Sequence, residues 1–393
     1  MKHYFLGASA NYSRKERLAH AFAVGREKDR KNLKEFLEKK YSGEAILTKN
    51  GRSALALALK AYFKPGDAVI VNGFTCYAVY EAIKSTGLVP IWADINKDTL
   101  NFDTRTIEEA ILRAGPAGFS SPKILPSANI LGDPLQPSPA RGKLSGIIIQ
   151  NSLGNPVDIV AIEKLAKKYG LTIIEDLAHC VGMKYLDGRE AGTVGSAVAF
   201  SFGKDKSIDT ISGGAVVLRA PYDGVIKAPS KLPKISDTLR ARFYPLFGAI
   251  SRGLSYVCLG GTWMRMLVKI HFVEKSADNK LDLDRKIAKF EAKLALRQFK
   301  KPSKKPLREF YLVENRSEVL KKLKDSGYYF DGFWYERPVS PERYYKKVHF
   351  PENECLISVE VTKKIINLPT YYNKKELSQA HEIIKNYIEE GKK

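Results

Sequence analysis

The sequence predicts an α/β protein, with a three-layer, mostly parallel sheet and a smaller α/β domain at the C-terminus. Residues 45–63 have the pattern of a strand, a glycine turn and an Ala/Leu-rich helix, and residues 65–95 repeat strand, helix and strand. Residues 144–176 resume this alternation, and two more apolar strands follow at 197–202 and 213–218. Alternation of this kind is typical of parallel sheets that carry helices on both faces.

Composition divides the chain into three predicted parts. Residues 1–220 form the large domain, which starts with two polar helices before about residue 40 and contains a Pro-, Gly- and Ser-rich excursion at 114–144. Residues 221–300 are expected to be an apolar and basic helical insert or linker. Residues 301–393, where helices and strands alternate again, are expected to be the small C-terminal α/β domain. A chain of 393 residues suits two or three such units and can enclose a deep site.

The net charge and the spacing of the cysteines limit the classes of function that we expect for this protein. A net charge of +22 favours polyanionic partners, but the lysines are spread over the whole chain. No zinc finger, RNP-like strand or isolated basic arm is visible, so we expect no specific nucleic-acid binding. Cys76, Cys180, Cys258 and Cys355 lie far apart, which predicts neither a metal site nor a disulfide framework. Residues 1–20 lack the apolar segment of a secretion signal, so a cytoplasmic location is expected.

Three polar side chains come at the ends of predicted strands. Asp176 closes the apolar strand 171–176, Ser201 lies in the next strand, and Lys206 follows five residues later in a polar turn. Strand ends of an α/β sheet meet at one crevice, where such folds bind ligands. Taken alone, Asp176 has the plainer explanation of a helix cap and Lys206 that of a surface lysine. Together they predict a site that contains an acid, a hydroxyl and an amine.

Five stretches of the chain carry a resemblance to a known family. They are TKNGRSALALAL (48–59), GFTCYAVYEAI (73–83), QNSLGNPVDIVAIEKLAKKYGLTIIEDLAHCVG (150–182), VAFSFGKDKSIDTISGGAVV (198–217) and IINLPTYYNKKEL (365–377). These stretches resemble the DegT/DnrJ/StrS family of sugar aminotransferases, which use pyridoxal 5'-phosphate and have the fold of aspartate aminotransferase (PLP fold type I). The resemblance covers most of residues 1–220 and the last hundred or so, and it is weak from about 220 to 300.

The resemblance implies a role for each matching residue. Lys206 would form a Schiff base with pyridoxal phosphate and then shuttle the proton of the transfer. Asp176 would pair with the pyridine nitrogen, and His179 would contact the ring hydroxyl. Ser201 and the Gly51–Arg52 turn would hold the phosphate, through a hydroxyl and through N–H groups at a helix N-terminus.

The chain departs from the family pattern at three places. Arg52 stands where Thr or Ser is usual, and its side chain could add charge to the phosphate site or point away. The position of the aromatic residue that stacks on the cofactor holds Cys76, with Tyr77 beside it and Phe74 two residues before, so the residue that covers the ring stays open. The Asn that the partner subunit usually gives to the phosphate has no visible counterpart.

The resemblance implies a homodimer with sites at the subunit interface and a role in polysaccharide biosynthesis. By this resemblance, the protein would move an amino group from an amino acid, expected to be glutamate, to a nucleotide-linked keto-sugar. Sugar dehydratases of this fold replace the lysine by histidine, so Lys206 favours transamination. Two alternatives remain: another reaction on the same cofactor, such as sugar dehydration, and a non-catalytic regulatory or membrane-binding protein. A pure binder would need neither Lys206 nor Asp176.

The stretch 240–273 is apolar and aromatic but contains five basic residues. These are Arg240, Arg242, Arg252, Arg265 and Lys269. No part of the stretch reaches the ~20 uninterrupted apolar residues of a membrane-spanning helix. One interpretation is a pair of helices packed on the core or in a dimer interface. The other is a helix that lies on an anionic membrane, which would make the protein peripheral to the inner face of that membrane.

Overall fold

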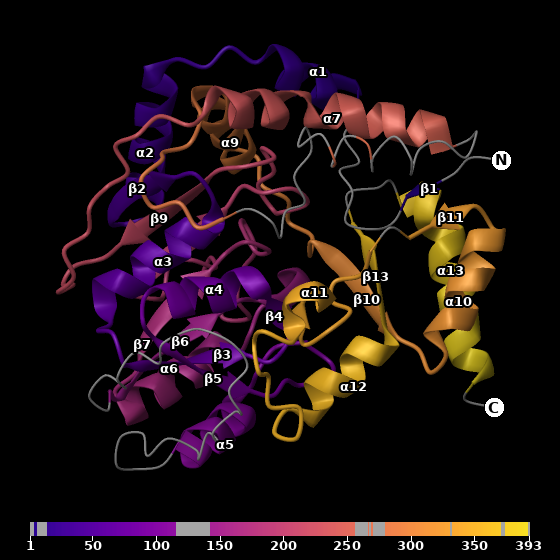
Figure 1. Ribbon diagram of the computed structural model, residues 1–393. Helices are drawn as coiled ribbons and strands as arrows, with labels where there is room; N and C mark the ends of the chain where they lie inside the picture. The colour runs from indigo at the N-terminus through magenta and orange to yellow at the C-terminus, as the bar shows by residue number, and fades with distance from the viewer. Residues whose placement is uncertain are drawn as a thin grey trace.

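A computed structural model describes residues 4–5, 14–114, 142–255, 266, 269, 280–330, 332–370 and 374–391. Its centre is a seven-stranded sheet in the order β2-β9-β8-β7-β6-β3-β5 (Figure 1). The strands are β2 (Glu44–Thr48), β3 (Ala68–Asn72), β5 (Val89–Ala93), β6 (Leu144–Ile149), β7 (Thr172–Asp176), β8 (Ala197–Ser201) and β9 (Gly214–Leu218). All neighbours pair in parallel except β9, which is antiparallel to both β2 and β8. The prediction of a mostly parallel sheet is therefore confirmed.

Helices cover both faces of this sheet, as the alternating pattern predicted. The helices are α2 (Glu27–Tyr41), α3 (Gly51–Tyr62), α4 (Tyr77–Ser85), α5 (Thr104–Ala114), α6 (Ile159–Tyr169) and α9 (Lys289–Phe299). Ile147 and Ile149 of β6 pack in one core cluster with α2, α5, α6 and α9. Ile148 between them packs in a second cluster with α3 and α4. Successive strand residues point to opposite faces, so an apolar run such as β6 is expected where both faces are covered.

Sequence-local signals explain where the helices beside the site begin. The side chain of Asn50 accepts a hydrogen bond from Ser53 N (2.8 Å) and thereby caps α3. In the same way Asp158 caps α6 by accepting from Ala161 N (3.1 Å). Both are residue types whose short polar side chains satisfy the first N–H groups of a helix.

The C-terminal region adds a smaller sheet and its own core. β10 (Arg308–Leu312) pairs antiparallel with β13 (Ile365–Pro369), while α10 (Arg316–Asp325) packs against α13 (Lys374–Glu390). β1 (Tyr4–Phe5) pairs in parallel with β11 (Tyr328–Tyr329), so the start of the chain joins the last part of it. No pattern in the sequence predicted this pairing.

Part of the C-terminal region packs on the large sheet region instead. β12 (Val339–Ser340) pairs in parallel with β4 (Thr75–Cys76), and Val348 and Phe350 belong to the core cluster of α3 and α4. α11 (Glu342–Tyr345) and α12 (Leu356–Lys364) flank these residues. The predicted domain boundaries at residues 220 and 300 stay a prediction, because segments from both sides of these boundaries pack against each other.

Two helices lie across the top of the molecule in Figure 1: α1 (Arg14–Phe22) and α7 (Ile235–Ser255). They pack against each other and, with α9, surround a small cluster that includes Ala241 and Phe290. α7 is the described part of the apolar, basic stretch. Most of residues 256–279, and residues 115–141 of the Pro-rich excursion, lie outside the described residues. Within the described residues no helix is long and apolar enough to cross a bilayer.

A buried carboxylate holds the loop beside β7. Glu175 accepts hydrogen bonds from Gly192 N (2.6 Å), Val194 N (2.8 Å), Gly195 N (2.6 Å) and the hydroxyl of Tyr185 (2.7 Å). Its neighbour on the strand is Asp176, whose side chain takes the opposite face of the sheet because of the strand pleat. Glu175 therefore fixes the end of β7 from which Asp176 projects.

We expect Glu175→Gln to lower the free energy of unfolding by about 2–4 kcal/mol, because an amide cannot accept from four donors and brings its own N–H groups. Urea denaturation measures this. The control is Glu163→Gln, which removes an exposed ion pair with Arg189 and should cost less than about 1 kcal/mol. Equal losses in the two variants would contradict the anchoring role of Glu175.

Candidate active site

Lys206 lies on a turn that follows β8 and is held from two sides. Ser207 N donates to Ala178 O (3.2 Å), which joins the lysine turn to the loop after β7. On the other side, Gln298 of α9 accepts from Asp209 N and donates to Asp209 O, both at 2.7 Å. The turn therefore has little freedom relative to the strand ends.

The imidazole of His179 contacts the amine of Lys206. His179 Nε2 lies 3.0 Å from Lys206 Nζ, and Nδ1 accepts a hydrogen bond from Leu153 N (3.2 Å). Burial first, and then the positive charges of Lys206 and Arg308, hold the pKa of His179 well below its usual range. A neutral ring that accepts at Nδ1 carries its proton on Nε2. The Nε2–H group therefore faces Lys206 Nζ, but an ammonium has no lone pair, so it can donate to this nitrogen only when the lysine amine is uncharged.

A tight turn places the Leu153 N–H group at His179. Leu153 has a φ of 56° within the short helix η1 (Ser152–Gly154), a backbone conformation that side chains rarely adopt. Buried amides hold the turn: Asn101 Oδ1 accepts from Ser152 N (2.7 Å), and Asn72 Nδ2 donates to the Ser152 hydroxyl (2.9 Å). The turn is part of the third stretch of resemblance, but the contact with His179 has no signature in the sequence.

Asp176 shares this site. It ends β7, and its carboxylate accepts from Ala178 N (3.0 Å). Burial raises the pKa of Asp176, while the positive charge of Lys206 and the Ala178 hydrogen bond act in the opposite direction. The structure thus brings together Lys206, Asp176 and His179, which the sequence singled out from separate segments.

Ser201 and Gly51 meet at the N-terminus of α3. A Cβ atom on Gly51 would lie 2.7 Å from Ser201 Oγ, so only glycine allows the helix to approach the end of β8 this closely. The first N–H groups of an α-helix have no partner within the helix, and the helix dipole makes this end positive. A hydroxyl beside such a helix end is a suitable place for an anion.

The side chain of Arg52 is directed to α4. Its guanidinium forms a buried ion pair with Glu81, which offsets its charge. Of the two orientations left open by the sequence, the structure has the one that points away from the helix end. Only the backbone N–H of Arg52 is then placed to contribute to an anion site.

Cys76 and Tyr77 lie at the start of α4. Cys76 Sγ accepts from Ala78 N (3.5 Å), and the ring of Tyr77 stacks on Tyr344 of α11 at 4.4 Å. The contacts described for Tyr77 therefore lie on the side of α11. Their role in cofactor binding stays a prediction.

Trp334 is the aromatic residue that contacts the lysine, and sequence reasoning missed it. Lys206 Nζ lies 4.6 Å from the centre of a Trp334 ring, and the His179 ring stacks on Trp334 at 5.0 Å. Buried Arg308 lies over the same side chain at 5.3 Å, and Asn367 binds both Trp334 O and Arg308. The aromatic run FWY at 333–335 was the available signal, but it does not reveal which distant segment it meets.

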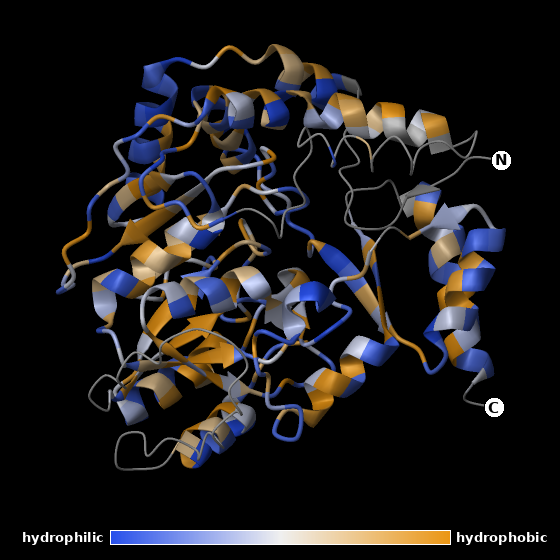
Figure 2. Ribbon diagram, in the orientation of Figure 1, coloured by the Kyte–Doolittle hydropathy of each residue, from blue (hydrophilic) through white to orange (hydrophobic). Residues whose placement is uncertain are grey.

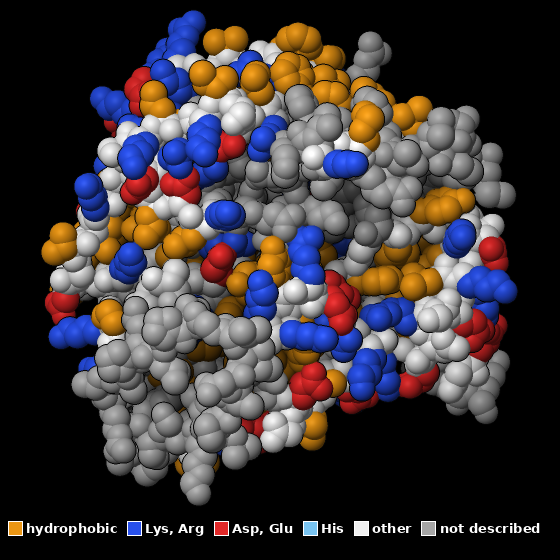
Figure 3. All heavy atoms as spheres, viewed as in Figure 1, with side chains coloured by type: hydrophobic (Ala, Val, Ile, Leu, Met, Phe, Trp, Pro, Cys, Tyr) orange, Lys and Arg blue, Asp and Glu red, His pale blue; other side chains and the backbone are white. Residues whose placement is uncertain are grey.

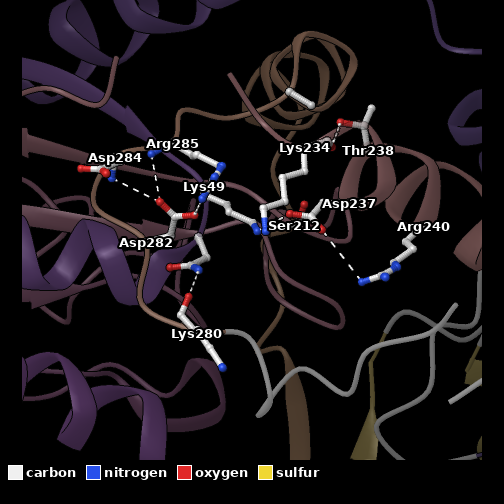
Figure 4. Close-up of polar contacts among 12 residues, drawn as sticks. Lys49, Ser212, Lys234, Asp237, Thr238, Arg240, Lys280, Asp282, Asp284 and Arg285 are labelled. Carbon is white, nitrogen blue, oxygen red and sulfur yellow. Dashed lines mark hydrogen bonds and ion pairs between the residues drawn. The ribbon is translucent and has the colours of Figure 1, made fainter. Parts of the chain in front are cut away.

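The chain beyond the apolar insert crosses the N-terminus of α3. Lys280 O accepts from Asn50 Nδ2 (3.0 Å), and Asp282 N donates to Ser53 Oγ (3.0 Å). Figure 4 shows Lys49 and Asp237 of α7 pointing at each other close by, and Asp282 turned to Arg285. The sequence region without a recognisable motif therefore covers the predicted anion site.

We expect stability to depend on pH through His179. Below a pH of about 6.5 the unfolded chain protonates this histidine and the folded chain does not, so the free energy of unfolding falls as pH falls. At pH 5 the loss relative to pH 7 is about 2 kcal/mol. In urea titrations, His179→Gln should remove this component, and His179→Ala should remove it too despite a lower overall stability. An unchanged pH dependence in both variants would contradict a neutral, buried His179.

Solved structures share the fold over nearly the whole chain. An aminotransferase described as DegT DnrJ EryC1 StrS, from Brucella abortus, aligns over 95% of this chain and 93% of its own, with a TM-score of 0.61 and 18% identity. A candidate sugar aminotransferase from Streptococcus pneumoniae, in its PMP form, aligns over 98% and 99%, with a TM-score of 0.62 and 17% identity. These likenesses confirm the predicted fold class.

Curated relatives match over a shorter part. GDP-perosamine synthase of Escherichia coli O157:H7 is 33% identical over 183 residues, which are 46% of this chain and 42% of that protein. A pleiotropic regulatory protein of Geobacillus stearothermophilus is 29% identical over 170 residues, 43% of this chain and 38% of that protein. The chain thus spans about two-fifths of the length of the curated relatives it matches.

The model of one protein family matches residues 21–223. This range is more than half of the 393 residues and contains Gly51, Asp176, His179, Ser201 and Lys206. The predicted family is therefore confirmed: the chain belongs to the DegT/DnrJ/EryC1/StrS aminotransferase family.

Proposed function

We propose that the protein is an aminotransferase that binds pyridoxal phosphate at this site and transfers an amino group to a sugar. The observation that carries the proposal is the Lys206 amine, held 3.0 Å from the neutral His179 ring with the Asp176 carboxylate in the same site. An amine that forms a covalent link needs a fixed position. It also needs a neighbour that does not place a second positive charge beside it. Family membership supports the reaction class.

The described residues fit this cofactor. Its phosphate suits the N-terminus of α3, where Gly51 lets the helix end approach Ser201, whose hydroxyl adds a donor. Its ring hydroxyl suits the Nε2–H group of His179. When bound, the cofactor supplies an electron sink for the carbon that loses its proton.

Each residue then has a distinct task. Asp176, as a carboxylate, would keep the pyridine nitrogen protonated, and a cationic ring would in turn stabilise the charge that burial disfavours. Lys206 Nζ would carry the proton between the two carbon atoms of the transfer. Trp334, whose ring lies 4.6 Å from the amine, would exclude water from it and limit its position.

For the substrates we propose glutamate as amino donor and a nucleotide-linked keto-sugar as acceptor. The resemblance supports the donor, and the relative named GDP-perosamine synthase supports the acceptor. A net charge of +22 also favours a substrate that carries a diphosphate. We further propose a homodimer in the cytoplasm, as the resemblance suggests.

A regulatory role is the second candidate, since one relative is named a pleiotropic regulatory protein. The group of Lys206, Asp176 and His179 favours catalysis, because ligand binding alone does not require an amine and an acid in one site.

The proposed function is tested with glutamate and a panel of nucleotide-linked keto-sugars, by following the aminated product. Lys206→Ala should lower the rate by at least about a thousandfold and remove the visible absorption of bound cofactor, because no other group can take over the covalent link.

Lys204→Gln is the matched control, since Lys204 lies two residues earlier and contacts the Tyr244 ring of α7 instead. It should keep most of the activity. A wild-type protein that binds no pyridoxal phosphate would overturn the enzyme proposal and favour the regulatory candidate.

Asp176→Asn should keep the covalent link but lower kcat by about a hundredfold or more, because a neutral amide no longer holds a proton on the ring nitrogen. Steady-state kinetics beside the absorption spectrum measure both effects. A variant with unchanged kcat would show that Asp176 is only a structural cap.

A further inference from the structure

α7 is apolar on two opposite sides, although it lies at the surface. Its inner side carries Ala241, which is buried, and Tyr244, whose ring contacts Lys204 Nζ at 3.9 Å. A second apolar row recurs on its outer side every three or four residues. This row consists of Ile235, Leu239, Phe243, Leu246 and Ile250, and we call it the outer stripe. A helix that is apolar on both sides belongs between two apolar layers, and the described residues supply only the inner one.

The outer stripe is open to solvent. Ile235 is 79% exposed, Leu239 and Ile250 are also exposed, and Phe243 and Leu246 are half-buried. The neighbouring helix α1 extends the apolar surface with Leu18 and Phe22, and Phe22 is 73% exposed. Figure 3 shows hydrophobic side chains gathered along the upper edge of the molecule, where Figures 1 and 2 place α1 and α7.

Basic groups stand next to this surface. An open groove of about 260 Å³ runs beside α1, with Leu18, Phe22 and Val24 on one wall and Lys293 and Arg297 of α9 on the other. Lys293 Nζ donates to Val24 O (2.9 Å), which fixes its amine at the rim of the groove. The nearby acid Glu27 forms ion pairs with Arg30 and Lys289 and adds little negative field.

We propose that α1, the outer stripe of α7 and this basic groove form a docking surface for a lipid bilayer that contains anionic lipids. α7 would lie parallel to the bilayer plane with its outer stripe among the acyl chains near the headgroups. Lys293 and Arg297 would bind anionic headgroups at the edge of the contact, with their aliphatic stems on apolar surface.

Charge favours a bilayer over a second copy of the chain as the occupant. Two copies that met through this surface would bring the basic groups of its groove, Lys293 and Arg297, close to their counterparts, whereas the homodimer proposed above has its interface at the active sites. An anionic headgroup layer is complementary to both the basic groups and the total charge. Each basic residue near such a surface strengthens binding by up to about tenfold.

The test is flotation of the purified full chain with vesicles of equimolar phosphatidylcholine and phosphatidylglycerol, beside vesicles of phosphatidylcholine alone, at low salt. The wild type should float with the anionic vesicles and stay behind with the neutral ones, and added salt should weaken its binding. The variant Ile235→Ser/Leu239→Ser/Ile250→Ser should bind at least about tenfold more weakly, because the serine side chains lose the apolar transfer energy.

A control places three serines at exposed apolar positions elsewhere: Leu112→Ser/Leu186→Ser/Val225→Ser. This variant should bind vesicles like the wild type. A second variant, Lys293→Gln/Arg297→Gln, changes only groove-lining charges at the surface and should weaken binding to anionic vesicles by roughly tenfold or more. Circular dichroism verifies the fold of each variant.

Three results would overturn the proposal. One is a wild type that does not float with anionic vesicles at low salt. Another is equal binding by the wild type, the stripe variant and the Lys293/Arg297 variant. The third is a dimer, seen by light scattering, that the stripe substitutions abolish while no form binds vesicles, which would assign the surface to a second copy. None of these readouts depends on amino transfer, so the proposed function is tested separately.

Discussion

The position of one lysine amine is the constraint on which the site depends. Lys206 has a long side chain with many rotamers, and holding its half-buried amine in one position costs conformational entropy. The neutral ring of His179 lies 3.0 Å from this amine without adding charge, and the Leu153 N–H group fixes which ring nitrogen carries the proton. Side-chain amides from two other segments hold the turn around Leu153. The chemistry of the site therefore extends well beyond the residues that touch the amine.

The strand-end positions that the sequence predicted lie where short-range patterns govern the geometry. Asp176, Ser201 and Lys206 come from one continuous run in which strand periodicity and turn residues place each side chain at a strand end. Parallel pairing of β7 with β8 then brings these ends together without further information. The prediction of His179 rested on resemblance, and its neutral state became clear only from its buried partners.

The unpredicted features depend on packing between distant segments. Trp334 reaches Lys206 from the C-terminal region, and no local periodicity encodes such an encounter. The ion pair of Arg52 with Glu81 reflects a choice of rotamer, which sequence patterns do not specify. The antiparallel direction of β9 was also not predictable from the sequence, since a fully buried strand has the same apolar pattern in either direction.

The pairing of β2 with β9 has a consequence for the order of folding. β2 follows the first helices of the chain, but its only neighbour in the sheet arrives with residues 214–218. The contacts of Trp334 and Asn367 come later still. Such long loops close slowly, after local helices and turns have formed. During synthesis the segment around Lys206 is therefore made before the C-terminal residues that surround it. A ligand that contacts all of these residues can stabilise only the folded chain. A chain with ligand bound at the site is therefore a chain that has completed its folding.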